Sequence, residues 1–324
     1  MSVMCKNTMS KLRESVKKEG LTVVASKGHG KTNTLMCVVS ELNGEGIPII
    51  IDYTSQHCFK LPFEVKFLNE SYWRKPRIEI NKPIILDFSQ TTKELAGEIL
   101  RDIIKKEYLK RVKIVIEGFR EGKDREEILK GFKWLVFCLE EAQDLIGRYL
   151  KSDDDLATAM NCGRNYKITF VYLTQRLADL ATSLVERCSY LIGKQTSDNN
   201  LRKISRILGI SRKKLKFIET LPKGSFIFYN GERVERLDFP KFLGFGRAYE
   251  VKRTIIKRKS PKESLWARLK DSFKPKIKDV IETTEQDSEE ASEQDSEENE
   301  EYKEDFSNEE YDWDEFLTTE EEWE

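Results

Sequence analysis

Residues 21–42 read LTVVASKGHGKTNTLMCVVSEL, and this stretch decides the fold. An apolar run at 21–25 is followed by a loop that contains two glycines and then by apolar residues at helical spacing. A strand, a glycine loop and a helix in this order form a phosphate-binding loop, because backbone N–H groups curl around phosphates at the positive end of the helix. The stretch therefore predicts a nucleotide site.

The loop follows the pattern G-x-x-x-x-G-K-[ST], with Ala25 in the first glycine position. Lys31 is expected to reach the β- and γ-phosphates of ATP, and Thr32 to supply a hydroxyl to Mg²⁺. His29 lies inside the loop and is better placed beside phosphate than in a metal site. The alternative is a lysine in an ordinary turn before a helix. The residues that we expect to bind ATP are Ser26, Lys27, Gly28, His29, Gly30, Lys31, Thr32 and Asn33.

Two adjacent glutamates follow a second apolar run, FKWLVFCLEEAQDL at 132–145. A run without alternation is typical of a central strand that helices cover on both faces. We expect Glu140 to hold Mg²⁺, directly or through its water, and Glu141 to polarise the attacking water. The alternative is a pair that caps a solvated strand end.

A third apolar run, ITFVYLTQ at 168–175, ends in Gln175. We expect this strand to lie between the phosphate-loop strand and the glutamate strand. The Gln175 amide would then reach both the γ-phosphate and the attacking water, which makes it a sensor candidate.

Strands and helices alternate along the rest of the chain, which predicts an α/β fold with a mostly parallel central sheet flanked by helices, of the additional-strand P-loop type. Asn230-Gly231 indicates a hairpin turn within 223–239. Further strands are expected at 47–52, 65–68, 77–80, 83–89 and 189–195, and helices at 91–111, 153–166, 178–188 and 199–209.

These motifs together resemble the HerA/FtsK superfamily of DNA-pumping ATPases, which includes coupling proteins of conjugation and viral genome-packaging ATPases. The resemblance covers about residues 20 to 240, through AxxxxGKT, LVFCLEEAQ and GRNYKITFVYLTQRLADLATSLVERCSYLIGKQTSDNN. It implies a RecA-like sheet and a homo-hexameric ring with ATP at the subunit interfaces and double-stranded DNA moved through the pore.

The resemblance also assigns roles to residues. It gives the metal role to Glu140, the base role to Glu141 and the sensor role to Gln175. A trans-acting arginine finger is favoured at Arg164, with Lys194 as the alternative and a plain surface arginine as the simpler interpretation. Family members usually have Asp at the position of Glu140 and Gly at that of Ala25.

Charge divides the chain strongly. Residues 279–324 carry 23 acidic residues against one lysine, a balance of −22, while residues 1–278 carry +21. A body this basic indicates a polyanionic partner, although a basic surface kept soluble by an acidic tail is the simpler alternative. The expected parts are a leader helix (1–20), the ATPase domain (21–250), a basic helical or linker segment (251–278) and a disordered acidic tail (279–324).

The two C-terminal parts each allow two interpretations. The segment 252–278 has eleven basic residues and either contacts DNA or a ring surface, or is a solvated linker. The tail either competes with DNA for the basic body or docks a protein partner through Trp313, Phe316 and Trp323.

Neither a membrane-spanning run nor a signal peptide is present, and the six cysteines are scattered. We therefore expect a cytoplasmic protein, in the host cytoplasm if it is encoded by a virus or plasmid. The expected function is that of an ATP-hydrolysing motor that packages or transfers double-stranded DNA. The alternative is a nucleotide-gated ring-forming binding or assembly protein with little hydrolysis.

Overall fold

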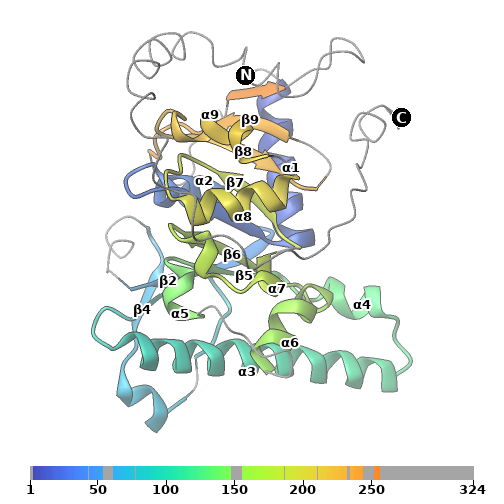
Figure 1. Cartoon of the computed structure of the whole chain (residues 1–324). Helices are drawn as coiled ribbons and strands as arrows, with labels where there is room; N and C mark the ends of the chain where they lie inside the picture. The colour runs from blue at the N-terminus through green and yellow to red at the C-terminus, as the bar shows by residue number, and fades with distance from the viewer. Residues whose placement is uncertain are drawn as a thin grey trace, which may run out of the picture. The chain divides into compact units, whose positions relative to one another are not determined.

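The computed structural model of the chain describes residues 3–42, 44–53, 61–76, 78–146, 155–185, 187–209, 211–231, 234–243 and 252–255. They all belong to one compact unit, Met1–Ile255 (Figure 1). The expectations for the acidic tail, and for the basic segment beyond Ile255, lie outside the described residues.

The described strands form one sheet of ten in the order β10-β9-β8-β7-β1-β6-β5-β2-β4-β3. The strands from β7 to β3 pair in parallel, and β8, β9 and β10 add an antiparallel edge. Their bounds are β1 Leu21–Val24, β2 Gly46–Asp52, β3 Glu64–Phe67, β4 Ile84–Asp87, β5 Trp134–Leu139, β6 Ile168–Thr174, β7 Ser189–Ile192, β8 Ser225–Tyr229, β9 Val234–Asp238 and β10 Lys252–Ile255.

The position of β6 confirms the predicted fold class. β6 pairs in parallel with β1 on one side, where Val24 lies opposite Thr174, and with β5 on the other, where Leu139 lies opposite Tyr172. It is thus the additional strand between the phosphate-loop strand and the glutamate strand. Because the three strands are parallel, their carboxyl ends meet at one edge of the sheet. Open α/β sheets bind their ligands in a crevice at this edge.

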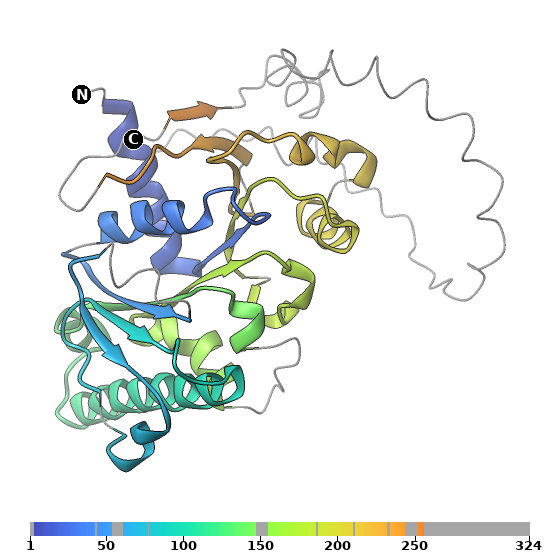
Figure 2. The ribbon, with the colours of Figure 1, turned by 90° about the vertical axis from the view of Figure 1, so that its left-hand side faces the viewer.

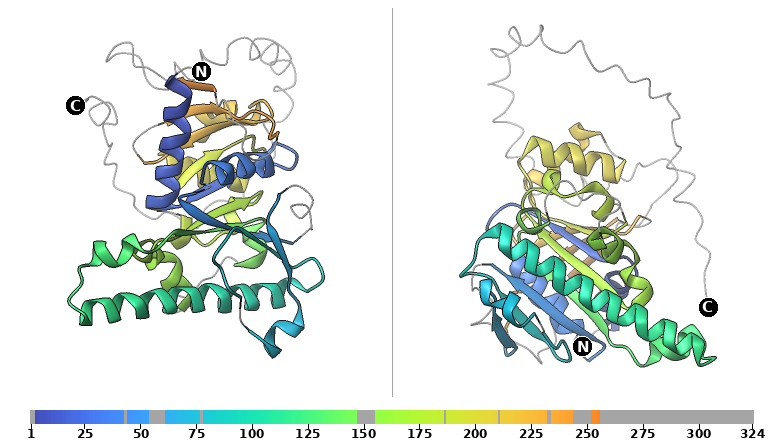
Figure 3. Two further views of the ribbon diagram at one scale, coloured as in Figure 1. Left: turned by 180° about the vertical axis from the view of Figure 1, so that it is seen from behind. Right: turned by 90° about the horizontal axis from the view of Figure 1, so that it is seen from below.

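Helices cover both faces of the sheet, which explains why its central strands are apolar throughout. α1 (Val3–Glu19) and α2 (Lys31–Leu42) lie in front in Figure 3, left, whereas α6 (Asp155–Cys162), α7 (Thr182–Val185) and α8 (Asp198–Leu208) lie in front in Figure 1. The remaining helical elements are η1 Glu70–Arg74, α3 Lys93–Arg120, α4 Arg125–Lys130, α5 Ala142–Leu145, η2 Gly163–Tyr166, η3 Leu177–Asp179, η4 Arg212–Leu215 and α9 Lys216–Glu219.

Helix α1 packs into the core of this unit. Met9, Leu12 and Val16 recur every three to four residues and are at most 3% exposed. They belong to the same apolar cluster as α2 and the central strands. The amphipathic pattern of the first twenty residues thus buries a stripe against the domain (Figure 2).

Helix α3 is longer than the sequence predicts, since it continues to Arg120 beyond the expected end at 111 (Figure 3, right). Arg111 is 8% exposed and donates to the backbone oxygens of Lys133, Tyr166 and Lys167, at 2.8, 2.7 and 3.0 Å. These carbonyls precede β5 and β6, so Arg111 ties the helix to the beginning of both strands. Burial lowers the pKa of Arg111 to about 10, while the nearby Glu107 opposes this shift.

Two other predictions are wrong in detail. Residues 78–80 form no strand. The predicted helix at 178–188 is reduced to η3 and the short α7, because Leu180 between them is extended (φ −85°, ψ 141°). The Ala178 N–H donates to Asn200 Oδ1 at 3.1 Å and so has a side-chain acceptor in place of a helical carbonyl. The hairpin of β8 and β9 is as predicted, with Gly231 in the left-handed region (φ 88°).

Candidate nucleotide site

The loop between β1 and α2 has the backbone geometry of a phosphate cradle. Gly28 and Gly30 both adopt positive φ, 78° and 110°, which an L side chain rarely tolerates. A Cβ on Gly28 would meet nothing within 4 Å, so conformation and not space demands the glycine. α2 begins at Lys31 directly after the loop, so its unpaired N–H groups face the cradle.

Neighbouring strands hold the beginning of the loop. The Ala25 N–H donates to Thr174 O at 3.2 Å, and the Ser26 N–H donates to Lys194 O at 2.8 Å. Gly193, beside Lys194, has no room for a side chain, since a Cβ there would lie 2.4 Å from His29 Cδ2 and 2.8 Å from Ala25 Cβ. The loop conformation is therefore set from outside as well as by its own glycines.

His29 anchors the loop to β8. Its Nε2 lies 2.9 Å from Ser225 O, and its ring meets the Phe226 ring edge-on at 5.2 Å between centroids. The side chain is 5% exposed, and burial lowers the pKa of His29, so the neutral ring donates from Nε2. We expected this residue to bind ATP, and the structure gives its side chain a partner within the protein.

Asn33 holds the segment that follows β9. Its Nδ2 donates to Pro240 O at 2.8 Å, and its Oδ1 accepts from the Phe242 N–H at 2.7 Å. The Asn33 side chain thus positions residues 240–242 beside the cradle. Lys241 and Phe242 consequently line the same cavity as the loop.

Lys31, Thr32 and Glu140 meet where β1 and β5 end. Lys31 Nζ donates to Ala25 O at 2.9 Å, and Thr32 Oγ1 donates to Glu140 Oε1 at 2.7 Å. Burial lowers the pKa of Lys31, while the charges of Glu141 and Glu140 oppose this shift. A hydroxyl and a carboxylate in contact beside a phosphate cradle are the oxygen donors that Mg²⁺ takes alongside nucleotide phosphates, so the residues present fit Mg²⁺-ATP.

Glu141 has a strained backbone conformation, and two side-chain amides bind its carboxylate. Its φ and ψ are 46° and 47°, the left-handed region that costs a non-glycine residue about 1–2 kcal/mol. Gln175 Nε2 donates to its Oε1 at 2.5 Å and Gln143 Nε2 to its Oε2 at 2.8 Å. The two carboxylate oxygens are thus fixed separately, and Glu140 points to Thr32 instead.

Gln143 is the residue that the sequence analysis missed. It is 7% exposed, and its Oε1 accepts from Thr174 Oγ1 at 2.6 Å while its Nε2 binds Glu141. It therefore links the carboxyl ends of β5 and β6. The only signal in the sequence was its place two residues after Glu141, on the first turn of α5.

Outer contacts fix the ends of these strands. Asn200 Nδ2 donates to Gln175 O at 2.7 Å and to Gln195 Oε1 at 2.9 Å. Asp144 accepts from Lys93 at 2.6 Å and from Arg176 at 2.8 Å. The backbone of Gln175 is thus bonded to Asn200 on α8, and Arg176, the next residue, is paired with Asp144 after β5.

A cavity of about 1100 Å³ opens over the cradle, large enough for a nucleoside triphosphate. Its lining contains Lys31, Thr32, Glu140, Glu141 and Gln175 together, with Lys223 and Lys241 as further cations. The arrangement offers an anion cradle, a pair of oxygen donors for a cation and a carboxylate positioned to accept a proton.

The two candidates for the trans-acting finger, Arg164 and Lys194, do not lie in this cavity. Arg164 is in η2, before β6 begins and therefore at the opposite end of that strand from Gln175, and it lines a different cavity. Lys194 contributes only its carbonyl to the loop, and its side chain is exposed. Neither side chain lines the nucleotide cavity of its own chain.

The fold and the loop together define the class: the chain has the additional-strand, RecA-like fold of P-loop NTPases, as the sequence predicted. Among the described residues, no helix is long and apolar enough to cross a membrane. Searches of protein-family models and of curated proteins gave no match.

Several solved structures are similar to the chain. The genome packaging NTPase B204 of Sulfolobus turreted icosahedral virus 2, in complex with ATP-gammaS, matches 65% of this chain and 91% of its own at 16% identity and a TM-score of 0.46. VirB4 of Thermoanaerobacter pseudethanolicus matches 66% and 87% at 13% identity and a TM-score of 0.42. EssC (ATPases 2 and 3) of Geobacillus thermodenitrificans matches 83% and 45% at 12% identity and a TM-score of 0.41.

Proposed function

We propose that the chain binds Mg²⁺-ATP and hydrolyses it. One observation carries this proposal: the adjacent glutamates after β5 have separate partners, Glu140 at Thr32 and Glu141 at Gln175 and Gln143. A pair that merely caps a solvated strand end has no reason to divide in this way. This arrangement suits Glu140 as a ligand of the cation and Glu141 as the base for the attacking water.

Each residue then has a defined task. The cradle N–H groups and Lys31 bind the phosphates, and Lys31 neutralises negative charge that develops on them. Thr32 and Glu140 would hold Mg²⁺, which would supply positive charge to the phosphates when bound. Glu141 accepts a proton from the water whose oxygen attacks the γ-phosphorus, while the bond to the β–γ bridging oxygen breaks and ADP leaves. Gln175 orients both the carboxylate and the water.

We further propose that hydrolysis moves double-stranded DNA, as in packaging or DNA transfer, through a homo-hexameric ring of this chain. The resemblance of the motifs and the basic balance of residues 1–278 support this part. In such a ring, Arg164 of one copy would act on ATP bound to the next, with Lys194 as the alternative. The acidic tail would dock a protein partner or compete with DNA.

A nucleotide-gated assembly protein is the second candidate. Glu140 stands where the family usually has Asp, and its longer side chain reaches Thr32 directly at 2.7 Å. Direct binding of a cation by both oxygens would require that contact to open, which would slow turnover, whereas binding by Glu140 through a water would not. In this case ATP would order a ring with little hydrolysis.

ATP hydrolysis, measured with and without double-stranded DNA, distinguishes the two candidates. The motor requires turnover that rises with DNA and is lost in Lys31→Ala and in Glu141→Gln. Glu126→Gln, an exposed glutamate on α4, is the matched control and should leave turnover unchanged. Binding of ATP that depends on Lys31, with no turnover in the unmodified protein, would instead support the assembly protein.

A further inference from the structure

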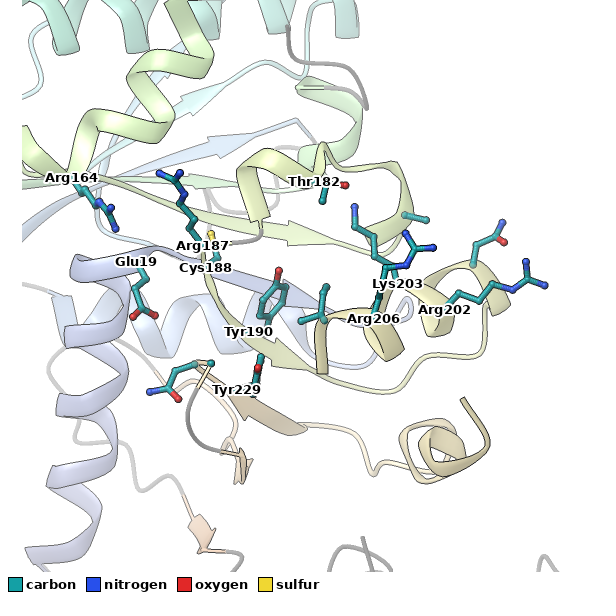
Figure 4. A pocket seen from close by; sticks show the side chains of 15 residues that line it. Glu19, Arg164, Thr182, Arg187, Cys188, Tyr190, Arg202, Lys203, Arg206 and Tyr229 are labelled. Carbon is teal, nitrogen blue, oxygen red and sulfur yellow. The ribbon is translucent and has the colours of Figure 1, made fainter. Parts of the chain in front are cut away.

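A second cavity, of about 1020 Å³, lies between α8 and the strands β7 and β8 and shares no lining residue with the nucleotide cavity. Figure 4 shows its side chains from close by. We call it the basic groove. Its charged lining residues are Glu19, Arg164, Arg187, Arg202, Lys203 and Arg206.

The lining of the basic groove contains more positive than negative side chains. Within that part, the guanidinium groups of its four arginines make no ion pair or hydrogen bond, and all four residues are exposed. The single carboxylate, Glu19, accepts from Ser189 Oγ at 2.8 Å. Lys203, the fifth cation, donates to Leu180 O at 2.8 Å. Four exposed arginines beside one carboxylate make the potential around this cavity positive, which favours an anion.

The cations lie on two sides of the groove. Arg187 lies on the side of Glu19, together with Arg164, which the proposed function gives to ATP on the next copy and not to DNA. Arg202, Lys203 and Arg206 project from α8 on the other side (Figure 4). Arg202 and Arg206 are four residues apart, and so share one face of the helix. One phosphate is satisfied by one or two guanidinium groups, so cations spread over two walls fit an anion with several phosphates.

Two tyrosines form the floor between these walls. The rings of Tyr190 and Tyr229 are 6.4 Å apart between centroids and inclined by 32°. Tyr190 is only 2% exposed, so the half-buried Tyr229 alone offers ring surface, on which a backbone sugar can pack while phosphates meet the cations. The remaining polar lining residues, Thr182, Asn199 and Asn230, add hydrogen-bonding groups.

We propose that the basic groove binds the phosphodiester backbone of a nucleic acid. The inference deepens the proposed function, on which it rests for the choice of duplex DNA, by assigning the DNA a contact surface on the chain. Phosphate contacts carry no sequence information, so binding is independent of base sequence. Each contact releases condensed counterions, so the groove makes a measurable contribution to salt dependence.

The test is the affinity of the full chain for a labelled duplex of about 20 base pairs, measured by fluorescence anisotropy at several salt concentrations. Arg202→Ala/Arg206→Ala removes two cations from one wall. Arg74→Ala/Arg120→Ala removes two exposed arginines outside the groove and is the matched control. If both groove arginines contact phosphates, the slope of log K against log salt falls by about 1.8, which is about 60-fold in affinity near 0.1 M salt. The control should change affinity by about 2-fold or less.

Arg187→Ala tests the opposite wall and is expected to lower the slope by about 0.9. Equal DNA affinity of the groove variant and the control, or no DNA binding by the unmodified chain, would overturn the proposal. A groove variant that binds DNA normally but loses ATP turnover would overturn it too, and would assign these arginines to nucleotide on a neighbouring copy. Loss of DNA affinity in a chain that never hydrolyses ATP would support the groove while refuting the ATPase.

Discussion

Replacing Gln143 with methionine removes two hydrogen bonds at constant side-chain length. The Gln143 amide bonds Glu141 Oε2 at 2.8 Å and Thr174 Oγ1 at 2.6 Å, in a position that is 7% exposed. A hydrogen bond to a charged group contributes about 1.5–3 kcal/mol. If that energy fixes Glu141 for proton transfer, its loss lowers kcat about 10- to 150-fold.

The KM for ATP should change by about 2-fold or less, because Gln143 does not line the nucleotide cavity. Steady-state ATP hydrolysis gives both constants, and Gln90→Met, an exposed glutamine, is the matched control. The thermal midpoint should also fall, since the variant leaves Thr174 Oγ1 with the Arg176 N–H alone as a partner. A variant with unchanged kcat, or one in which KM rises while kcat stays the same, would refute the role of Gln143 in positioning Glu141.

Three further predictions concern the scaffold of the site. Gly193→Ala should weaken ATP binding and cost about 1–3 kcal/mol of stability, because its Cβ would lie 2.4 Å from His29 Cδ2. The control Gly131→Ala should change neither ATP binding, measured by calorimetry, nor stability, measured by chemical denaturation. Burial lowers the pKa of His29, so the contribution of His29 to stability should be complete above pH 6.5 and decrease as the pH falls below it. The thermal midpoint of His29→Gln should therefore decrease less over the same pH range than that of the unmodified protein. Arg111→Leu should cost about 2–4 kcal/mol in urea denaturation, because it removes the hydrogen bonds from Arg111 to three carbonyls, of which Lys167 O keeps the Leu135 N–H; a cost below about 1 kcal/mol would contradict the role of this arginine.

Local patterns predicted the central fold correctly. The run before Lys31 and the run before Glu140 were recognisable as strands, because a strand covered on both faces must be apolar throughout. The order of motifs also placed β6 between β1 and β5, as the structure confirms. This success has a physical basis, because a phosphate loop requires a strand, a turn and a helix that are contiguous in sequence.

Contacts between distant segments were not predictable in the same way. The side chain of His29 donates to Ser225 O, and that of Asn33 donates to Pro240 O. We had expected both residues to bind ATP. The end of α3 was also misplaced, because the partners of Arg111 are carbonyls more than twenty residues away. A pattern of apolar residues shows which face of an element is buried but not which polar group it meets.

The sequence by itself determined the class of fold, the phosphate loop and the carboxylates after β5, because each depends on residues that are close together along the chain. Only the tertiary structure decided which oxygen of Glu141 meets which amide, and that Gln143 joins Thr174 to it. Only the tertiary structure, likewise, gathered the arginines of the basic groove from η2, the start of β7 and α8. The reason is that parallel strands bring their ends together in space, whatever their separation in sequence.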